Sequence, residues 1–135
     1  MLRTVAVAGL SMFLLSACGS QGGGAASSDP NAGLDTQILN WRTSIEESHE
    51  TCSAKVEGKG CQDFQVTCKA MQEITPEDTA KGVTSKIVAS IRFAARNTDG
   101  STGKSGSAFA VFTKTGDAWT RAESPPVNPS TCAPL

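Results

Sequence analysis

The stretch that decides the fold is residues 83–96, "VTSKIVASIRFAAR". Apolar side chains return at every second position over most of its length, and polar side chains fill many of the positions between them. This period of two is typical of an antiparallel strand with one face in the core and the other in water. The inward set is Val83, Ile87, Ala89, Ile91, Phe93 and Ala95, and the outward set is Thr84, Lys86, Ser90, Arg92 and Arg96.

Three further strands are predicted on either side of this stretch. The segment 63–70, "DFQVTCKA", alternates in the same way, and "SAFAVFTK" at 107–114 and "AWTRAE" at 118–123 read as two more strands. "TGD" at 115–117 predicts a tight hairpin turn between the last two strands. In "TPEDTAKG", residues 75–82, a threonine cap and a proline at the first helical position predict one helical turn between the first two strands.

Before the first of these strands the period changes to 3.6. Residues 34–52 carry an apolar stripe on one helical face and charges on the opposite face. Asp35 is placed to cap the start, and "EGKG" at 57–60 is placed to end it. We therefore expect an amphipathic helix of about 18 residues. The stripe is Leu34, Ile38, Trp41, Ile45 and Cys52, and the charged face is Arg42, Glu46, Glu47 and Glu50.

These segments predict an α+β domain over residues 34–135, in which one N-terminal amphipathic helix packs on a four-stranded antiparallel meander. The helix would cover the apolar face of the strands. In topology alone, this arrangement resembles the cystatin and NTF2-like domains, and such a likeness says nothing about activity. The Q-x-V-x-G loop of the cystatins is absent, because Gln65-Val66-Thr67-Cys68 does not supply it.

The domain contains an even set of cysteines, which favours two disulfides in an exported protein. No C-x-x-C pair exists and His49 is the only histidine, so we expect no metal site. The sequence likewise suggests no cofactor. The four cysteines are Cys52, Cys61, Cys68 and Cys132.

Three pairings of these cysteines are possible, and chain geometry favours one. If the first strand runs back along the helix, Cys61 lies near Cys52, whereas Cys68 is roughly 23 Å further along the strand. A disulfide needs α-carbons within about 7 Å. We therefore expect the pairs Cys52–Cys61 and Cys68–Cys132. The second pair would pin the proline-rich tail, residues 125–135, across the sheet.

The N-terminus resembles the export signal of a bacterial lipoprotein. Residues 1–17, "MLRTVAVAGLSMFLLSA", have one arginine and then a short apolar run, which is typical of a signal peptide. The ending Leu15-Ser16-Ala17-Cys18 is similar to a lipobox. The resemblance implies that Cys18 carries lipid and becomes the first residue of the mature chain. An ordinary secretory signal with an unrelated cysteine is the alternative.

The segment that follows Cys18 predicts a membrane tether. Residues 18–33 are mostly Gly, Ser and Ala, too small to bury much apolar surface, and they reach roughly 20 Å as a flexible chain. Several acyl chains hold a protein to a bilayer far better than one. Gly19 follows the cysteine, which by resemblance to enterobacterial sorting implies the outer membrane, with the domain facing the periplasm.

The stretch "TDGSTGKSG", residues 98–106, ends like a phosphate-binding loop, with Gly103-Lys104-Ser105. A phosphate-binding loop needs a glycine where Thr98 stands, and it leads into a helix rather than a strand. We therefore expect a long glycine-rich hairpin loop and no bound nucleotide. We also expect no nucleic-acid partner, because 12 basic residues stand against 13 acidic ones without a basic tract.

No set of residues in the sequence forms a recognisable active site, so we expect a non-catalytic, membrane-anchored envelope lipoprotein. It would bind or help to assemble another envelope component through the outer sheet face or the hairpin loops. One alternative is a small-ligand pocket between helix and sheet, in space left by Ala89, Ala108 and Ala110. Another is an enzyme inhibitor. A cleft that joined His49 to a serine and a carboxylate would instead favour an enzyme.

Overall fold

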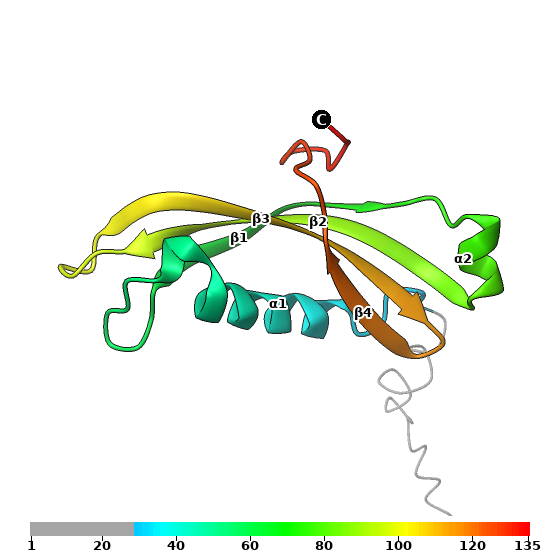
Figure 1. Cartoon of the computed structure of the whole chain (residues 1–135), viewed down its shortest axis with the longest axis horizontal. Helices are drawn as coiled ribbons and strands as arrows, with labels where there is room; N and C mark the ends of the chain where they lie inside the picture. Colours follow the sequence, from blue (N-terminus) through cyan, green and yellow to red (C-terminus); the bar gives the residue numbers. More distant parts are fainter. Residues whose placement is uncertain (1–28) are drawn as a thin grey trace, which may run out of the picture.

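The computed structural model describes residues 29–135. Within this range the four strands form one antiparallel sheet in the order β1-β2-β3-β4, which confirms the predicted meander. In Figure 1 the sheet is curved, with α1 on its concave side and the C-terminal tail on its convex side. The elements are α1 (Leu34–Ser48), the 3₁₀ turn η2 (Glu50–Cys52), β1 (Cys61–Met71), α2 (Pro76–Ala80), β2 (Val83–Arg96), β3 (Thr102–Thr115) and β4 (Ala118–Glu123).

Helix α1 is 15 residues long, and its first turn differs from the prediction. Gly33 takes the N-cap position with a φ of 88°, so Asp35 lies inside the first turn rather than before it. There its carboxylate still favours the helix, because the N-terminal end of the helix dipole is positive. Cys52, which was expected on the same helix, belongs to η2 instead, because the backbone becomes extended at His49.

The main core lies between α1 and the concave face of the sheet. The buried residues of the helix are those of the predicted stripe: Leu34, Ile38, Trp41 and Ile45. They join Ile87, Ala89, Ile91 and Phe93 of β2, together with Phe112 of β3, in one cluster. Trp41 and Phe112 meet edge to face, with ring centroids 5.5 Å apart. No helix within residues 29–135 is long and apolar enough to cross a membrane.

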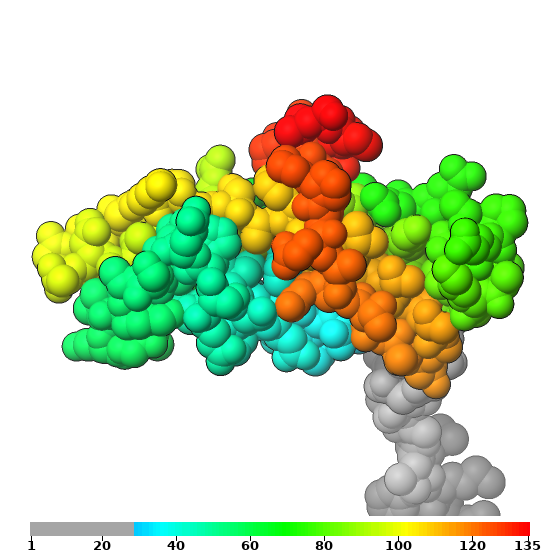
Figure 2. Space-filling view, viewed as in Figure 1, coloured from blue at the N-terminus to red at the C-terminus, as the bar shows by residue number. Residues whose placement is uncertain are grey.

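The convex face carries a second, smaller core that the sequence reading missed. Ser90 was expected in water, but it is 1% exposed, and its neighbour Val88 is 2% exposed. Val88 packs in a cluster with Val127 of the C-terminal tail, which crosses this face. Figure 2 shows the tail, orange to red, rising over the sheet. The expectation of a solvated outer face is therefore wrong at the centre of β2.

Both expected disulfides are present. Cys52 and Cys61 join η2 to the start of β1, with α-carbons 5.0 Å apart. Cys68 and Cys132 join β1 to the tail, with α-carbons 5.7 Å apart. The second bond holds the tail on the convex face, because both of its cysteines belong to the small core there.

The hairpin between β2 and β3 is tighter than predicted. Strand β3 begins at Thr102, so Gly103-Lys104-Ser105 lies inside a strand and the connection is only residues 97–101. The long-loop prediction was wrong because pairing with β2 imposes strand structure on a segment with no apolar pattern of its own. A phosphate-binding loop joins a strand to a helix, so this backbone does not form one.

Candidate binding groove

A groove runs between α1 and the edge strand β1. It consists of two adjoining cavities, of about 490 and 270 Å³, that share Leu39, Arg42 and Phe64. Within residues 29–135, strand β1 pairs with β2 alone, so its outer side borders this groove. The other residues that line it are Thr43, Glu46, Lys59, Cys61, Gln62 and Arg96 in the larger cavity, and Asp35, Ile38, Val66, Lys69 and Ile91 in the smaller one.

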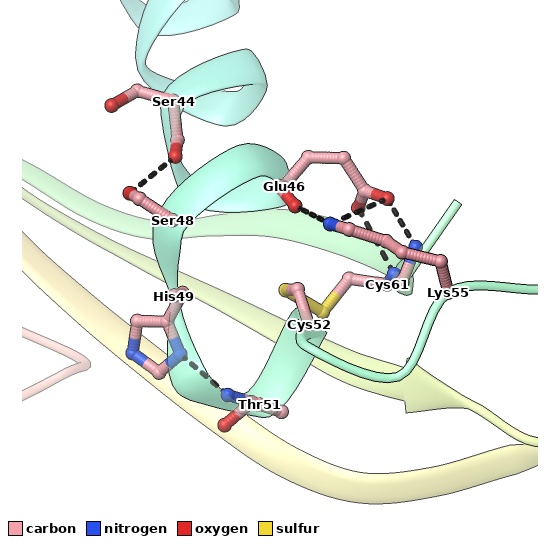
Figure 3. Close-up of a disulfide and its surroundings, with 9 residues drawn as sticks. Ser44, Glu46, Ser48, His49, Thr51, Cys52, Lys55 and Cys61 are labelled. Atoms are coloured by element: carbon pink, nitrogen blue, oxygen red, sulfur yellow. Dashed lines mark hydrogen bonds and ion pairs between the residues drawn. A yellow bond between two sulfur atoms is a disulfide. The ribbon is translucent and has the colours of Figure 1, made fainter. Parts of the chain in front are cut away.

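Glu46 closes one end of the groove by tying α1 to the start of β1. The backbone N–H of Cys61 donates to Glu46 Oε2 at 2.9 Å, and the N–H of Gly60 donates to Oε1. Lys55 Nζ lies 4.0 Å from the same carboxylate (Figure 3). Glu46 was expected on a solvated helix face, but it acts as a polar clamp over the Cys52–Cys61 bond.

The clamp depends on a very close approach of two chain segments. A Cβ built on Gly60 would lie 1.8 Å from the carbonyl oxygen of Cys52. Only glycine fits there, and its small size brings the N–H groups of Gly60 and Cys61 within reach of Glu46. The Arg96 N–H also donates to the Gly60 carbonyl at 3.0 Å, which holds this end of β1 against β2.

Positive side chains border the groove along its length. Lys59 and Arg96 lie at the clamp end, Arg42 lies over the Phe64 ring at 5.0 Å from its centroid, and Lys69 lies toward the other end. The Nε atom of Arg96 is buried and has no hydrogen-bond partner in residues 29–135. The lining holds these four cationic side chains and two carboxylates, Asp35 and Glu46, so the groove is net positive.

The groove also has an apolar surface. Leu39 is 57% exposed, although it lies in the middle of α1. Phe64 and Val66 of β1 are half-buried beside it, and both pack partly against the main core. Exposed apolar surface bordered by polar side chains is typical of interaction sites.

The region around His49 gathers the residue types that a hydrolase uses, but in a different geometry. A cavity of about 250 Å³ is lined by His49, Ser48, Glu50 and Glu123, among others. His49 Nδ1 accepts a hydrogen bond from the Thr51 backbone N–H at 3.1 Å (Figure 3). Nδ1 therefore does not donate to a carboxylate, as the histidine of a Ser-His-Asp triad does through this atom.

The neighbouring serine is also engaged in local structure. The Ser48 hydroxyl donates to the Ser44 carbonyl one turn earlier, at 2.7 Å. The His49 ring packs edge to face on Phe93, with centroids 4.8 Å apart. His49 thus serves as the N-cap of η2 and as part of the wall of the core, and this arrangement is not that of a catalytic triad.

Two other candidate clusters have structural explanations. Glu46, Cys52 and Cys61 place possible metal-ligand atoms within 4.8 Å of one another, but both sulfurs belong to a disulfide. At the hairpin, the Ser101 hydroxyl and backbone N–H both bond to Asp99, and they lower the pKa of its carboxyl.

Cys18, the predicted lipid attachment site, lies outside the described residues.

The sequence reading did not identify the groove, although one signal was present. Leu39 is a large apolar residue outside the helical stripe, three positions before Arg42. Its partners on β1 could not be assigned before the pairing of helix and strand was known.

Comparison of the chain with models of known protein families, with curated proteins and with solved structures finds no match.

Proposed function

We propose that this chain is a lipid-anchored, non-catalytic binding module of a bacterial cell envelope, and that the groove between α1 and β1 is its binding surface. The observation that carries the proposal is the exposed Leu39, set beside half-buried Phe64 and ringed by positive side chains. The lipobox-like residues Leu15 to Cys18 support the anchor, with Gly19 favouring the outer membrane and a periplasmic domain. The two disulfides are consistent with an oxidising compartment.

The geometry supports this proposal over a small-ligand pocket between helix and sheet. Ala89 and Ala110 are fully buried in the same cluster as three large aromatic rings. Those rings, of Trp41, Phe93 and Phe112, are at most 1% exposed, so they fill the layer around Ala89 and Ala110. The third alanine, Ala108, is half-buried and lines the cavity of about 250 Å³ beside His49. Enzyme inhibition would be one form of the same binding function.

The anchor is tested by fractionating cells that express the chain. We expect the wild type in the membrane fraction without residues 1–17 and with a mass increase from acyl chains, and the Cys18→Ala variant without any acyl mass. A wild type without added mass, or acyl mass that persists in Cys18→Ala, would contradict lipid anchoring.

The binding surface is tested by crosslinking in the same cells. A photoreactive residue at Leu39 should give a discrete adduct with an envelope component, because this position lies in the groove. The matched control is Asn40, an exposed neighbour on α1 outside the groove lining, which should give none. Equal adducts at both positions, or none at Leu39, would count against the groove as the binding surface.

A further inference from the structure

The groove has the dimensions of a short extended peptide. Strand β1 borders the groove from Cys61 to Lys69, which is a distance of eight residues along the strand. At about 3.3 Å per residue, the groove is roughly 25 Å long. An extended chain of about eight residues covers that distance. The lining changes along this length, so a ligand that fills it meets several distinct contact points rather than one.

The contact points alternate between charge and apolar surface. Lys59 and Arg96 border one end, Leu39 and Phe64 lie next to Arg42 in the middle, and Lys69 borders the other end. The whole chain has 12 basic and 13 acidic residues, so the positive groove stands out on a nearly neutral protein. Charge complementarity therefore favours a ligand with carboxylates separated by apolar groups.

Arg96 adds a specific reason for an acidic ligand. Its buried Nε lacks a hydrogen-bond partner in residues 29–135, and its side chain lines the groove. A buried donor without an acceptor is unfavourable. A carboxylate satisfies this donor only by bonding to Nε itself, which requires the Arg96 side chain to turn toward the groove as the ligand binds.

Two features exclude other ways of using this surface. Strand β1 has irregularities between Gln62 and Gln65 and between Val66 and Cys68, which interrupt the ladder that an added strand would need. Phe64 and Val66 are recessed beside α1, so a flat lipid surface does not reach them. The groove is therefore suited to contacts with the side chains of a bound segment.

From these observations we infer that the groove binds an extended segment of another polypeptide, in which acidic side chains alternate with apolar ones. The carboxylates would pair with Arg96, Arg42 and Lys69, and the apolar side chains would cover Leu39 and Phe64. The inference rests on the proposed function, because it names the class of partner for the same groove.

The test is selection of a displayed library of random ten-residue peptides on the full chain in neutral detergent, with both disulfides intact. We expect enrichment of peptides that mix Asp or Glu with apolar residues. For a selected peptide, the double variant Arg42→Gln/Lys69→Gln should weaken binding by about tenfold. Raising the salt concentration should weaken it as well.

The matched control is Arg92→Gln/Lys104→Gln, which removes two positive charges from exposed positions outside the groove lining. It should leave the affinity of the selected peptide unchanged. All four altered side chains are exposed, so both double variants should keep the unfolding midpoint of the wild type. A control variant that weakens binding as much as the groove variant would overturn the inference.

Other outcomes also overturn it. Enrichment of basic or neutral peptides, or of none, contradicts an acidic segment. Vesicles of phosphatidylglycerol that bind through Arg42 and Lys69 while no peptide does would assign the groove to lipid. A wild-type dimer that the groove variant abolishes would assign it to a second copy. If a partner without an acidic segment were crosslinked at Leu39, the inference would be wrong and the proposed function would stand. If acidic peptides were selected but no adduct formed in cells, the proposed function would be contradicted instead.

Discussion

Glu46 is the residue on which the closed end of the groove depends. One carboxylate accepts the N–H groups of both Gly60 and Cys61, and its side chain is only 22% exposed. Glu46→Ala leaves two backbone donors without their acceptor, and we expect it to lower the free energy of unfolding by about 1–3 kcal/mol. Urea denaturation measures this. Glu47→Ala, at an exposed neighbour, is the control and should change it by less than about 0.5 kcal/mol.

At Gly60 the constraint is steric rather than polar. A methyl group there would overlap the Cys52 carbonyl, so we expect Gly60→Ala to destabilise the fold by about 3 kcal/mol or more. Gly58 offers a matched control, because its φ is 78° and nothing lies within 4 Å of an added Cβ. Gly58→Ala should lose only about 1–2 kcal/mol, from the left-handed backbone. Equal losses in thermal unfolding would contradict this explanation.

Among the elements, α2 shows local sequence signals that were sufficient. Thr75 caps the helix, accepting from the Asp78 N–H at 3.1 Å, while the Asp78 carboxylate accepts from the Thr75 N–H at 3.1 Å. The threonine and proline that predicted this turn, and the acidic residues that follow them, lie within four positions of one another. A structure built from such near neighbours can be predicted without knowledge of the rest of the fold.

The same box gives a prediction about pH. The backbone hydrogen bond from Thr75 is the main cause that lowers the pKa of Asp78 below 3.8, with the hydrogen bond from Lys86 next. A carboxyl with a lowered pKa stabilises the folded state above pH 3.8, and that contribution is lost as the pH falls through the lowered value. The difference in melting temperature between wild type and Asp78→Asn should therefore shrink below this pH. A constant difference down to pH 2 would contradict the assignment.

The two disulfides differ in the length of chain that they close. Cys68–Cys132 spans 64 residues and Cys52–Cys61 spans nine. The longer loop removes more entropy from the unfolded chain. Replacing Cys68 and Cys132 by alanines should therefore lower the free energy of unfolding by about 4 kcal/mol, and replacing Cys52 and Cys61 should lower it by about 2.5 kcal/mol. Chemical denaturation of the two double variants tests the order. A larger loss for the short loop would show that chain entropy is not the dominant contribution.

At the scale of the whole molecule, the sequence predicted what short-range patterns encode. The alternation in β2 gave the concave face of the sheet, and the stripe from Leu34 to Ile45 gave the buried face of α1. The small core around Val88 could not be predicted, because it depends on a tail about 40 residues later in the chain. The groove was missed for a similar reason, since Leu39 and Phe64 come from different elements and become neighbours only after folding.

Contacts between helix α1 and the sheet should make the domain one cooperative unit. Trp41 contacts Phe112 of β3 from the middle of α1, and the Trp119 indole N–H of β4 donates to Ala32 just before the helix, at 2.9 Å. Loss of the helix would expose the concave face of the sheet, so helix and sheet should unfold together. We expect the far-ultraviolet circular dichroism and tryptophan fluorescence transitions in urea to coincide.

Trp41→Ala tests the same cooperativity from inside the core. Trp41 is 1% exposed, so its truncation should lower the free energy of unfolding by about 3–5 kcal/mol. Leu39→Ala on the same helix removes a side chain that is 57% exposed and should have little effect, which separates packing from helix propensity. If the helical signal of Trp41→Ala were lost while the sheet kept its own cooperative transition, the strands would be stable without α1. The core would then not be a single unit.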